Sequence, residues 1–398
     1  MEFLPHIHQQ YLRNLKSTFR RDLLDQIDWN NRMIGINGAR GVGKTTLLLQ
    51  HILQKFGYSS DVLYLTMDHI QLSGVSLLEI ATYHADKGGT HLFIDEIHKS
   101  KDWSRELKTI YDLFPNLKIV FTSSSILEIY KGQADLSRRV IMYDLNGLSF
   151  REFLQIEAGL KFKHYNLNNI LEHHPEITHE ILDAGIKPLK YFNNYLNYGY
   201  YPFYLENAAT YPIKLLNIIN LTLEVDLVSI KNVDPVSIPK LKKLISILAS
   251  SVPFQPNISK LAGSLEITRN TLLLYLQYLK QAKILNLLQD NGSSYSYIAK
   301  PDKVLLHNAN LLLCLQPKSA NLGNIRETFF VNTISSQYLI NTSNQGDFIV
   351  EDKFTFEVGG ASKTQKQLAG LKDSYLIMDD IEFGSRNKIP LWLFGFLA

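Results

Sequence analysis

The sequence predicts an α/β protein in which a parallel sheet covered by helices is followed by smaller helical and mixed modules. Two observations support this class. Short apolar runs alternate with helix-like segments in the first part of the chain, and one of these runs leads into a glycine-rich loop that opens a helix. Apolar runs with helices between them are typical of a parallel sheet that is buried on both faces.

The composition bounds the function. The chain has 398 residues, a formal net charge of +3, and 45% hydrophobic and 20% charged residues. This length exceeds one typical domain, and the apolar fraction suits a globular protein. The balanced charge excludes a polycationic tail, and a lone cysteine, Cys314, excludes a disulfide framework or a Cys-rich zinc site. No secretory signal or membrane-spanning run is visible, so we expect a cytoplasmic protein without a membrane partner.

Five segments are expected along the chain. They are an N-terminal helical segment at 1–30, a parallel-sheet core at 31–150, a helical segment at 151–235, a helical module ending in a hairpin at 236–318, and a sheet-and-helix unit at 319–398. The boundaries follow changes in composition and the prolines that punctuate the region after residue 234.

Local periodicity predicts the elements of the first two segments. Apolar residues at four-residue steps favour a helix through Leu15, Phe19, Leu23 and Ile27. The expected core strands are 33–36, 62–66, 92–94, 119–122 and 140–143, and the expected helices are 44–56, 76–86 and 102–114. The gaps between the strands are long enough for the crossovers that a parallel sheet requires.

The glycine-rich loop carries the strongest motif. The segment Gly38-Ala-Arg-Gly-Val-Gly-Lys44-Thr45 matches G-x-x-x-x-G-K-[ST] at every fixed position, with a strand before it and a helix after it. Glycines let backbone N–H groups converge on phosphate oxygens, and the helix N-terminus favours negative charge. Lys44 would reach the β- and γ-phosphates, and the Thr45 hydroxyl would bind Mg²⁺. The predicted nucleotide-binding residues are Gly38, Ala39, Arg40, Gly41, Val42, Gly43, Lys44, Thr45 and Thr46.

Two adjacent carboxylates follow the apolar strand at 92–94. Asp95 suits a magnesium ligand, directly or through water, and Glu96 suits a general base that orients the attacking water. Acidic pairs also end many buried strands as solvated groups, so this motif gains its weight from the phosphate loop upstream.

The next two strand ends offer weaker candidates. Thr122 or Ser123 would contact the γ-phosphate or the attacking water; the alternative is a Ser/Thr segment that caps the following helix. Arg138 or Arg139 would stabilise transition-state charge, in cis or from a neighbouring subunit; the alternative is a solvated basic pair. The residues do not decide between the two arginines.

Four motifs in this order resemble the bacterial and archaeal AAA-type ATPases that carry a C-terminal domain of unknown function. They are Gly38 to Thr46, Phe93-Ile-Asp-Glu-Ile-His98, Phe121-Thr-Ser-Ser-Ser125 and Leu148-Ser-Phe-Arg-Glu-Phe153. The resemblance implies a five-stranded AAA-like P-loop NTPase core, with one strand between the Asp95 strand and the phosphate-loop strand. It also implies that 151–235 is a helical lid. One departure is that Ser123-Ser124 stands where the family usually has Gly-Ser.

The segment 236–318 reads as a winged helix. Two helices, at 258–262 and 272–284, are joined by a short turn and followed by a predicted hairpin of 285–289 and 295–298. Its second helix would enter a DNA major groove with support from Lys280, Lys283 and Lys300. The alternative is a module that packs on protein, since this helix carries few cations.

The segment 319–398 resembles a restriction-endonuclease-like fold of the PD-(D/E)xK kind. Glu327 is expected to open a helix, Asp347 to start a strand, and Glu357 to lie on the next strand. The resemblance places a lysine where this chain has Gly359; Lys363 or Lys366 would have to replace it. We favour a scaffold without nuclease activity, because phosphoryl chemistry needs the lost charge.

The sequence as a whole predicts an Mg²⁺-dependent ATPase that couples ATP binding and hydrolysis to movement of its C-terminal modules. The expected ligands are ATP and Mg²⁺, and the expected partners are DNA, a protein, or further copies of the chain. Two alternatives stay open: a slow ATP-dependent switch that recruits a protein partner, and an ATP-gated DNA nuclease.

Overall fold

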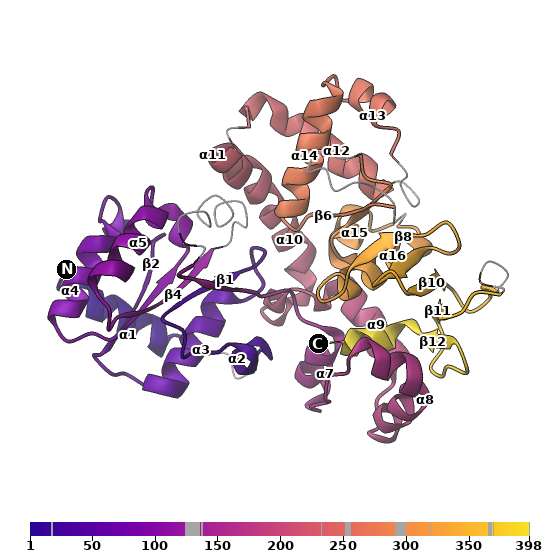
Figure 1. Cartoon of the computed structure of the whole chain (residues 1–398), viewed down its shortest axis with the longest axis horizontal. Helices are drawn as coiled ribbons and strands as arrows, with labels where there is room; N and C mark the ends of the chain where they lie inside the picture. Colours follow the sequence, from indigo (N-terminus) through magenta and orange to yellow (C-terminus); the bar gives the residue numbers. More distant parts are fainter. Residues whose placement is uncertain are drawn as a thin grey trace. The chain divides into compact units, whose positions relative to one another are not determined.

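The structure is a computed structural model that describes residues 1–16, 19–123, 136, 138–231, 233–250, 256–290, 300–318, 320–364, 368 and 370–397. The chain divides into two compact units, Met1–Gly147 and Leu148–Ala398 (Figure 1). Each unit has its own five-stranded sheet. In the part of the chain that the structure describes, no helix is long and apolar enough to cross a membrane.

The first unit contains a fully parallel sheet in the order β2-β3-β4-β1-β5. The α/β class and all five predicted strands are confirmed, with ends that shift by at most one residue. β4 separates β1 from β3, as the resemblance implied. The strands are β1 (Met33–Asn37), β2 (Val62–Thr66), β3 (His91–Asp95), β4 (Lys118–Ser123) and β5 (Ile141–Asp144).

Helices cover both faces of this sheet. Successive strand residues point to opposite faces, and apolar side chains on each face are buried by helices. Leu63 and Ile94 belong to a core that also contains residues of α4 (Leu77–Asp86) and α5 (Trp103–Leu113). Phe93 points to the other face, where its ring contacts His51 and Phe56 of α3 (Lys44–Phe56). These three helices confirm the predicted ranges within one residue at each end.

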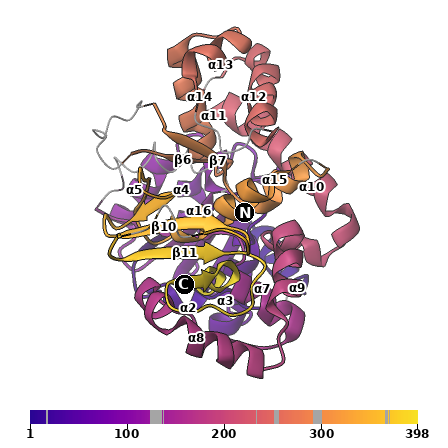
Figure 2. The same ribbon diagram turned by 90° about the vertical axis from the view of Figure 1, so that its right-hand side faces the viewer.

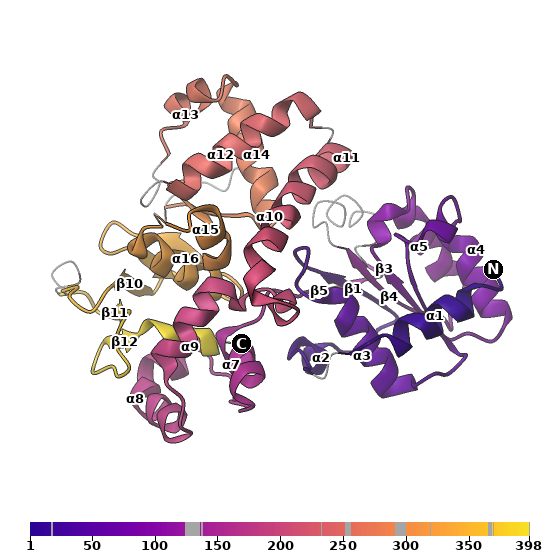
Figure 3. The same cartoon turned by 180° about the vertical axis from the view of Figure 1, so that it is seen from behind.

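The predicted helix through Leu15 and Ile27 is wrong. The N-terminal segment instead forms α1 (Leu4–Arg13), which runs alongside β2 and α3 (Figure 3), and a single short turn, α2 (Leu23–Gln26). The physical reason is that tertiary hydrogen bonds use this backbone: the Gln50 side chain donates to the Phe19 carbonyl at 2.6 Å. This tertiary contact, rather than the local period, sets the path of the backbone at Phe19.

The second unit begins with a helical region. Ser149 caps α7 (Phe150–Ala158), because its hydroxyl accepts the Glu152 N–H while the Glu152 carboxylate accepts the Ser149 N–H. This capping box accounts for the Leu148-Ser-Phe-Arg-Glu-Phe153 motif. The helices that follow are α8 (Leu167–Asp183), α9 (Pro188–Asn194), α10 (Tyr211–Leu221), α11 (Leu227–Lys231) and α12 (Ile238–Ser250).

A small module follows, with α13 (Ile258–Ser264), α14 (Arg269–Gln281) and an antiparallel pair, β6 (Leu285–Leu288) and β7 (Lys303–Leu306). The predicted stripe of Leu272, Leu276 and Leu279 is buried. The strand that pairs with β6 is 303–306; the strand expected at 295–298 falls outside the described residues.

The rest of the unit is a mixed sheet in the order β12-β11-β10-β9-β8. Its strands are β8 (Ile340–Thr342), β9 (Phe348–Val350), β10 (Phe354–Gly359), β11 (Ser374–Met378) and β12 (Lys388–Pro390). Figure 2 shows α16 (Leu322–Ile334) lying across this sheet, where Phe330 contacts the rings of Phe348 and Phe356. α15 (Ala309–Leu315) precedes it.

Glu327 does not open a helix, which corrects the sequence prediction. α16 begins five residues earlier, at Leu322, because the Asn321 side chain caps it by accepting the Asn324 N–H. Glu327 therefore projects from the middle of the helix and is buried. Asp347 directly precedes β9, and Glu357 lies within β10.

Two buried histidines make the stability of the first unit depend on pH. Burial lowers the pKa of His8 and of His51 to about 4. His8 Nδ1 accepts the Tyr64 N–H at 2.9 Å, and the His51 ring stacks on Trp29. Below an unfolded pKa of about 6.5, the unfolded chain binds protons that the folded chain does not.

We therefore expect the free energy of unfolding to fall as pH decreases from about 6.5 to 4, by up to about 1.4 kcal/mol per pH unit for each histidine. Urea unfolding followed by tryptophan fluorescence at several pH values measures this slope. His51→Gln should make it shallower, whereas His6→Gln, at an exposed histidine, should leave it unchanged. A pH-independent urea midpoint in the native chain would contradict the expectation.

Candidate functional site

The predicted phosphate loop lies between β1 and α3 at the carboxyl edge of the first sheet. Gly41 and Gly43 have φ values of 85° and 96°, which side chains with a Cβ rarely adopt. A Cβ on Gly38 would lie 2.3 Å from the Leu145 carbonyl oxygen. Glycine is therefore required at these positions by local geometry, and the loop brings the backbone around the first turn of α3.

Lys44 is the first residue of α3, and its side chain folds back into the loop. The ammonium group donates to the carbonyl oxygens of Gly38 and Ala39, at 2.9 Å each, and Lys44 is 5% exposed. A buried cation enclosed by a turn of backbone is suited to an anionic ligand. Thr45 and Thr46 follow in the first turn and are half-buried.

Asp95, at the end of β3, accepts hydrogen bonds from three neighbouring elements. Its Oδ2 atom lies 2.5 Å from the Thr45 hydroxyl of α3 and 3.0 Å from the Tyr64 hydroxyl of β2. Its Oδ1 atom accepts from the Thr122 hydroxyl of β4. Burial, and Asp95 beside it, raise the pKa of Tyr64, so this phenol stays a donor. Asp95 is 2% exposed, and the fold thus joins three predicted residues: Thr45, Asp95 and Thr122.

Glu96 and Ser123 lie on either side of His98. Glu96 has a left-handed backbone, with φ at 52°, and its N–H donates to the Thr122 hydroxyl. His98 Nε2 lies 3.5 Å from Glu96 Oε2, and His98 Nδ1 lies 2.9 Å from the Ser123 hydroxyl oxygen. Burial, with Lys99, Arg40 and Lys44 nearby, lowers the pKa of His98 to about 3, so the imidazole is neutral.

The two predicted arginines lie far from the loop within one chain. Arg138 and Arg139 precede β5, and the Arg139 guanidinium pairs with Asp112 at 3.1 Å near the end of α5. All strands of this sheet are parallel, so the start of β5 lies at the edge opposite the phosphate loop. Within one chain, this arrangement therefore favours the alternative in which an arginine acts from a neighbouring copy, which stays a prediction.

Arg21, which the sequence analysis missed, holds the phosphate loop in place. Its buried guanidinium donates to the Val42 carbonyl at 2.7 Å and to the carbonyls of Asn146 and Gly147 at 2.8 and 3.0 Å. It therefore connects the loop to the last residues of the first unit. Tyr64 and His98 were also missed. His98 stood in the motif Phe93 to His98, but only the adjacency of β3 and β4 reveals its contact.

Two family models match parts of the chain. Residues 30–154 match the model of an AAA domain, and residues 189–322 match a domain of unknown function, DUF8612. The AAA-type P-loop resemblance is thereby confirmed for the first of these segments.

Curated relatives come from Methanocaldococcus jannaschii. The uncharacterized protein MJ1637 is 27% identical over 290 residues, which cover 68% of this chain and 60% of the relative. The uncharacterized protein MJ1544 is 27% identical over 281 residues, covering 67% and 58%. The chain thus spans about three fifths of the length of these relatives.

Similar solved structures include a Walker-type ATPase of Pyrococcus abyssi, with a TM-score of 0.40 and 13% identity over 77% of this chain and 99% of that one. Another is DnaA from Aquifex aeolicus bound to AMPPCP, with a TM-score of 0.25 and 15% identity over 70% and 87% of the two chains.

Replacing Arg21 with Gln should destabilise the first unit by about 2–4 kcal/mol, because three carbonyl groups lose a charged donor in a buried place. Thermal unfolding of the variant measures this loss. Arg20→Gln is the matched control, since Arg20 pairs with Asp25 at the surface and should matter by less than about 1 kcal/mol. Equal effects of the two substitutions would show that the contacts of Arg21 do not hold the loop.

Proposed function

We propose that the chain is an Mg²⁺-dependent ATPase. The observation that carries this proposal is the pairing of two neighbouring contacts: the buried Lys44 ammonium donates to the loop carbonyl of Gly38, and the Thr45 hydroxyl lies 2.5 Å from Asp95 Oδ2 beside the phosphate loop. The AAA-domain match over residues 30–154 supports ATP as the nucleotide. Magnesium rests on the chemistry of the side chains alone.

The residues present fit both ligands. The backbone N–H groups of such a loop, together with the buried Lys44 ammonium, would suit the β- and γ-phosphates. The Thr45 hydroxyl and the Asp95 carboxylate are the oxygen donors that Mg²⁺ prefers. When bound, Mg²⁺ would supply positive charge to the phosphate oxygens. Tyr64 and Thr122 fix the Asp95 carboxylate, so it need not reorganise to serve that role.

Glu96 is the residue we assign to the attacking water. It directly follows Asp95, whose carboxylate accepts from Thr45 at the start of α3, and a carboxylate can accept a proton from water or hold the water in line. The Thr122 hydroxyl receives the Glu96 N–H and donates to Asp95, so one threonine sets the positions of both acids. We assign Thr122 to this structural task, and Ser123 to sensing of the γ-phosphate.

His98 is proposed to position Glu96. A carboxylate cannot donate, so the neutral imidazole would place its proton on Nε2, toward Glu96, and accept the Ser123 hydroxyl at Nδ1. This chain of contacts would link the orientation of the carboxylate to the state of Ser123. It would act on hydrolysis rather than on nucleotide affinity.

Lys44→Ala should abolish ATP binding in a calorimetric titration, because the buried ammonium is lost. Glu96→Gln should keep the dissociation constant for ATP within about threefold but lower kcat by about 100-fold or more.

His98→Ala should lower kcat by about tenfold at unchanged KM, with partial recovery in His98→Gln. Unchanged ATP affinity in Lys44→Ala would remove the proposal. Negligible phosphate release by the native chain, despite tight ATP binding, would favour the slow switch that recruits a protein partner.

Coupling to the second unit and assembly into oligomers are further parts of the proposal. Arg138 and Arg139 lie at the sheet edge opposite the phosphate loop, so either would reach a nucleotide only from a neighbouring copy of the chain. The helical segment 151–235 would serve as the lid. The module of α13, α14 and the β6–β7 pair would serve as a winged helix for DNA or protein, and duplex DNA that raises phosphate release would favour DNA.

A second candidate function is an ATP-gated nuclease, which one observation favours. The Lys363 ammonium lies 2.5 Å from Glu357 Oε1, and a Cβ on Gly359 would come within 2.7 Å of Lys363 Cβ. Lys363 thus occupies the place of the side chain that position 359 lacks, which supports its replacement of the missing lysine. Lys366 lies outside the described residues. One contact argues against nuclease activity: Lys303 already pairs with Glu327 at 2.6 Å, so this acidic group is occupied by a cation of the chain.

Nicking of supercoiled plasmid in Mg²⁺ or Mn²⁺ tests this second candidate. A nuclease would convert plasmid to the open circle, and both Asp347→Ala and Lys363→Gln would lower the rate at least about 100-fold. The matched control is Lys353→Gln, at an exposed lysine in the turn between β9 and β10. Equal nicking rates in the native chain and in Asp347→Ala would show that a contaminating nuclease cuts the plasmid. The absence of nicking would show that the unit is a scaffold without nuclease activity.

A further inference from the structure

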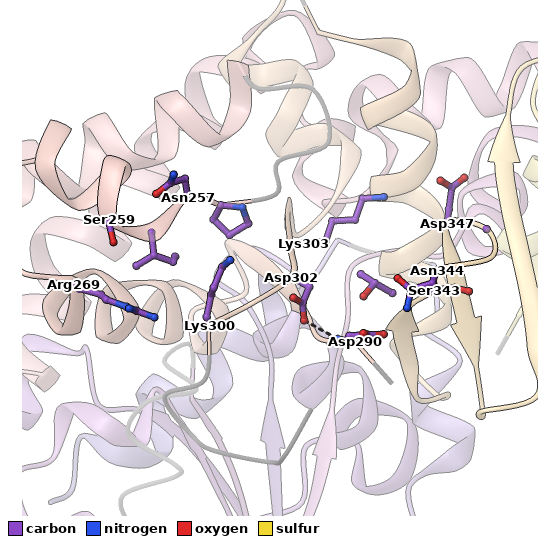
Figure 4. A pocket seen from close by; sticks show the side chains of 14 residues that line it. Asn257, Ser259, Arg269, Asp290, Lys300, Asp302, Lys303, Ser343, Asn344 and Asp347 are labelled. Atoms are coloured by element: carbon purple, nitrogen blue, oxygen red, sulfur yellow. Dashed lines mark hydrogen bonds between the residues drawn. The ribbon is translucent and has the colours of Figure 1, made fainter. Parts of the chain in front are cut away.

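The second unit contains a polar cavity of about 620 Å³ that the ATPase proposal does not use. Its wall is formed by the starts of α13 and α14, the residues just after β6 and just before β7, and the turn between β8 and β9 (Figure 4). The end of β8 is joined to the residue that follows β6, because the Thr342 N–H donates to the Gln289 carbonyl at 2.9 Å. The small module and the mixed sheet are therefore connected where they line the cavity.

Two cations at one end of this cavity are available to a ligand. Arg269 and Lys300 are exposed on its wall, and neither forms an ion pair with any residue that the structure describes. The third cation, Lys303, is already paired with Glu327.

Three acidic residues, Asp290, Asp302 and Asp347, also line the cavity, and backbone groups donate to two of them. Asp302 accepts the Asp290 N–H, and Asp347 accepts the Val358 N–H, both at 2.8 Å. Hydrogen bonds from amides spread the charge of a carboxylate, while a cation without a partner remains available to a ligand. An anionic group would bind at the end of the cavity where Arg269 and Lys300 lie.

The two ends of the cavity differ in chemistry. In Figure 4, Arg269 and Lys300 lie on the same side as Asn257 and Ser259, whereas Ser343, Asn344 and Asp347 lie on the opposite side. The first end suits a phosphate, because two cations and side-chain donors surround it. The second end is rich in acceptors, which suit the hydroxyl groups of a sugar and the amino groups of a base.

We propose that this cavity binds an unpaired nucleotide, with its phosphate against Arg269 and Lys300. Cavities of roughly 300–1,000 Å³ hold small ligands, and this volume has no room for a duplex. The cavity reaches Asp347, which faces the Glu357–Lys363 pair across β9 and β10. Because the cavity extends to these charged residues of the sheet, we favour a nucleotide within a single nucleic-acid strand over a free nucleotide as its ligand. The proposal depends neither on ATP hydrolysis nor on nuclease activity.

The test is fluorescence anisotropy of a fluorescein-labelled oligo(dT) of about 12 nucleotides, with the full chain carrying Lys44→Ala so that the phosphate loop does not contribute. Arg269→Gln and Lys300→Gln should each weaken binding by about tenfold, the effect of one lost charged hydrogen bond. The salt dependence should fall by about 0.7 in slope for each lost contact. Lys260→Gln is the matched control, because Lys260 is exposed on α13 but does not line the cavity.

Competition identifies the source of the nucleotide. Displacement of the labelled strand by AMP at similar concentration supports a free nucleotide, and no displacement supports a strand; both keep the site. Three results would overturn it: no binding of the strand or of AMP, equal losses of duplex and single-strand binding in the two cavity variants, or equal effects of Lys260→Gln and the two cavity variants. Circular dichroism of each variant checks that the second unit is folded.

Discussion

The carboxyl group of Asp95 holds the working edge of the first sheet together. Hydroxyl groups from α3, β2 and β4 all donate to it, and it is almost completely buried. A buried carboxylate without partners would cost several kcal/mol. The three donors therefore stabilise the acid and, at the same time, fix the positions of the elements that carry them. This one carboxylate therefore helps to position the start of the phosphate-loop helix and the neighbouring strands. It also acts on Glu96, through Thr122.

The parts that the sequence predicted are those that local pattern determines. Buried apolar runs marked all five strands of the first sheet, and the motif spacing marked Lys44, Thr45 and Asp95. Strand direction would also have located Arg138 and Arg139, since residues before a parallel strand lie opposite those after it. The helix through Leu15 and Ile27 failed because its period is local, whereas the hydrogen bonds of that segment are tertiary.

The residues that the sequence did not reveal act across elements. Tyr64 matters because β2 lies beside β3, and His98 matters because β4 brings Ser123 to it. Lys363 is six residues from Glu357 in sequence, yet the turn after β10 returns its ammonium to that carboxylate. No spacing rule predicts such a return, because the path of a turn depends on what it packs against. Sites that depend on adjacency therefore need the fold, whereas sites that depend on a single loop do not.

The guanidinium of Arg21 also sets the smallest fragment that can carry the site. The AAA-domain match starts at residue 30, after Arg21, and it extends into α7, which belongs to the second unit. A fragment cut to residues 30–154 would keep every predicted nucleotide-binding residue. It would nevertheless leave the carbonyls of Val42, Asn146 and Gly147 without their charged donor. The limits of sequence similarity and the limits of the working domain thus differ, and one side chain from outside the match accounts for the difference.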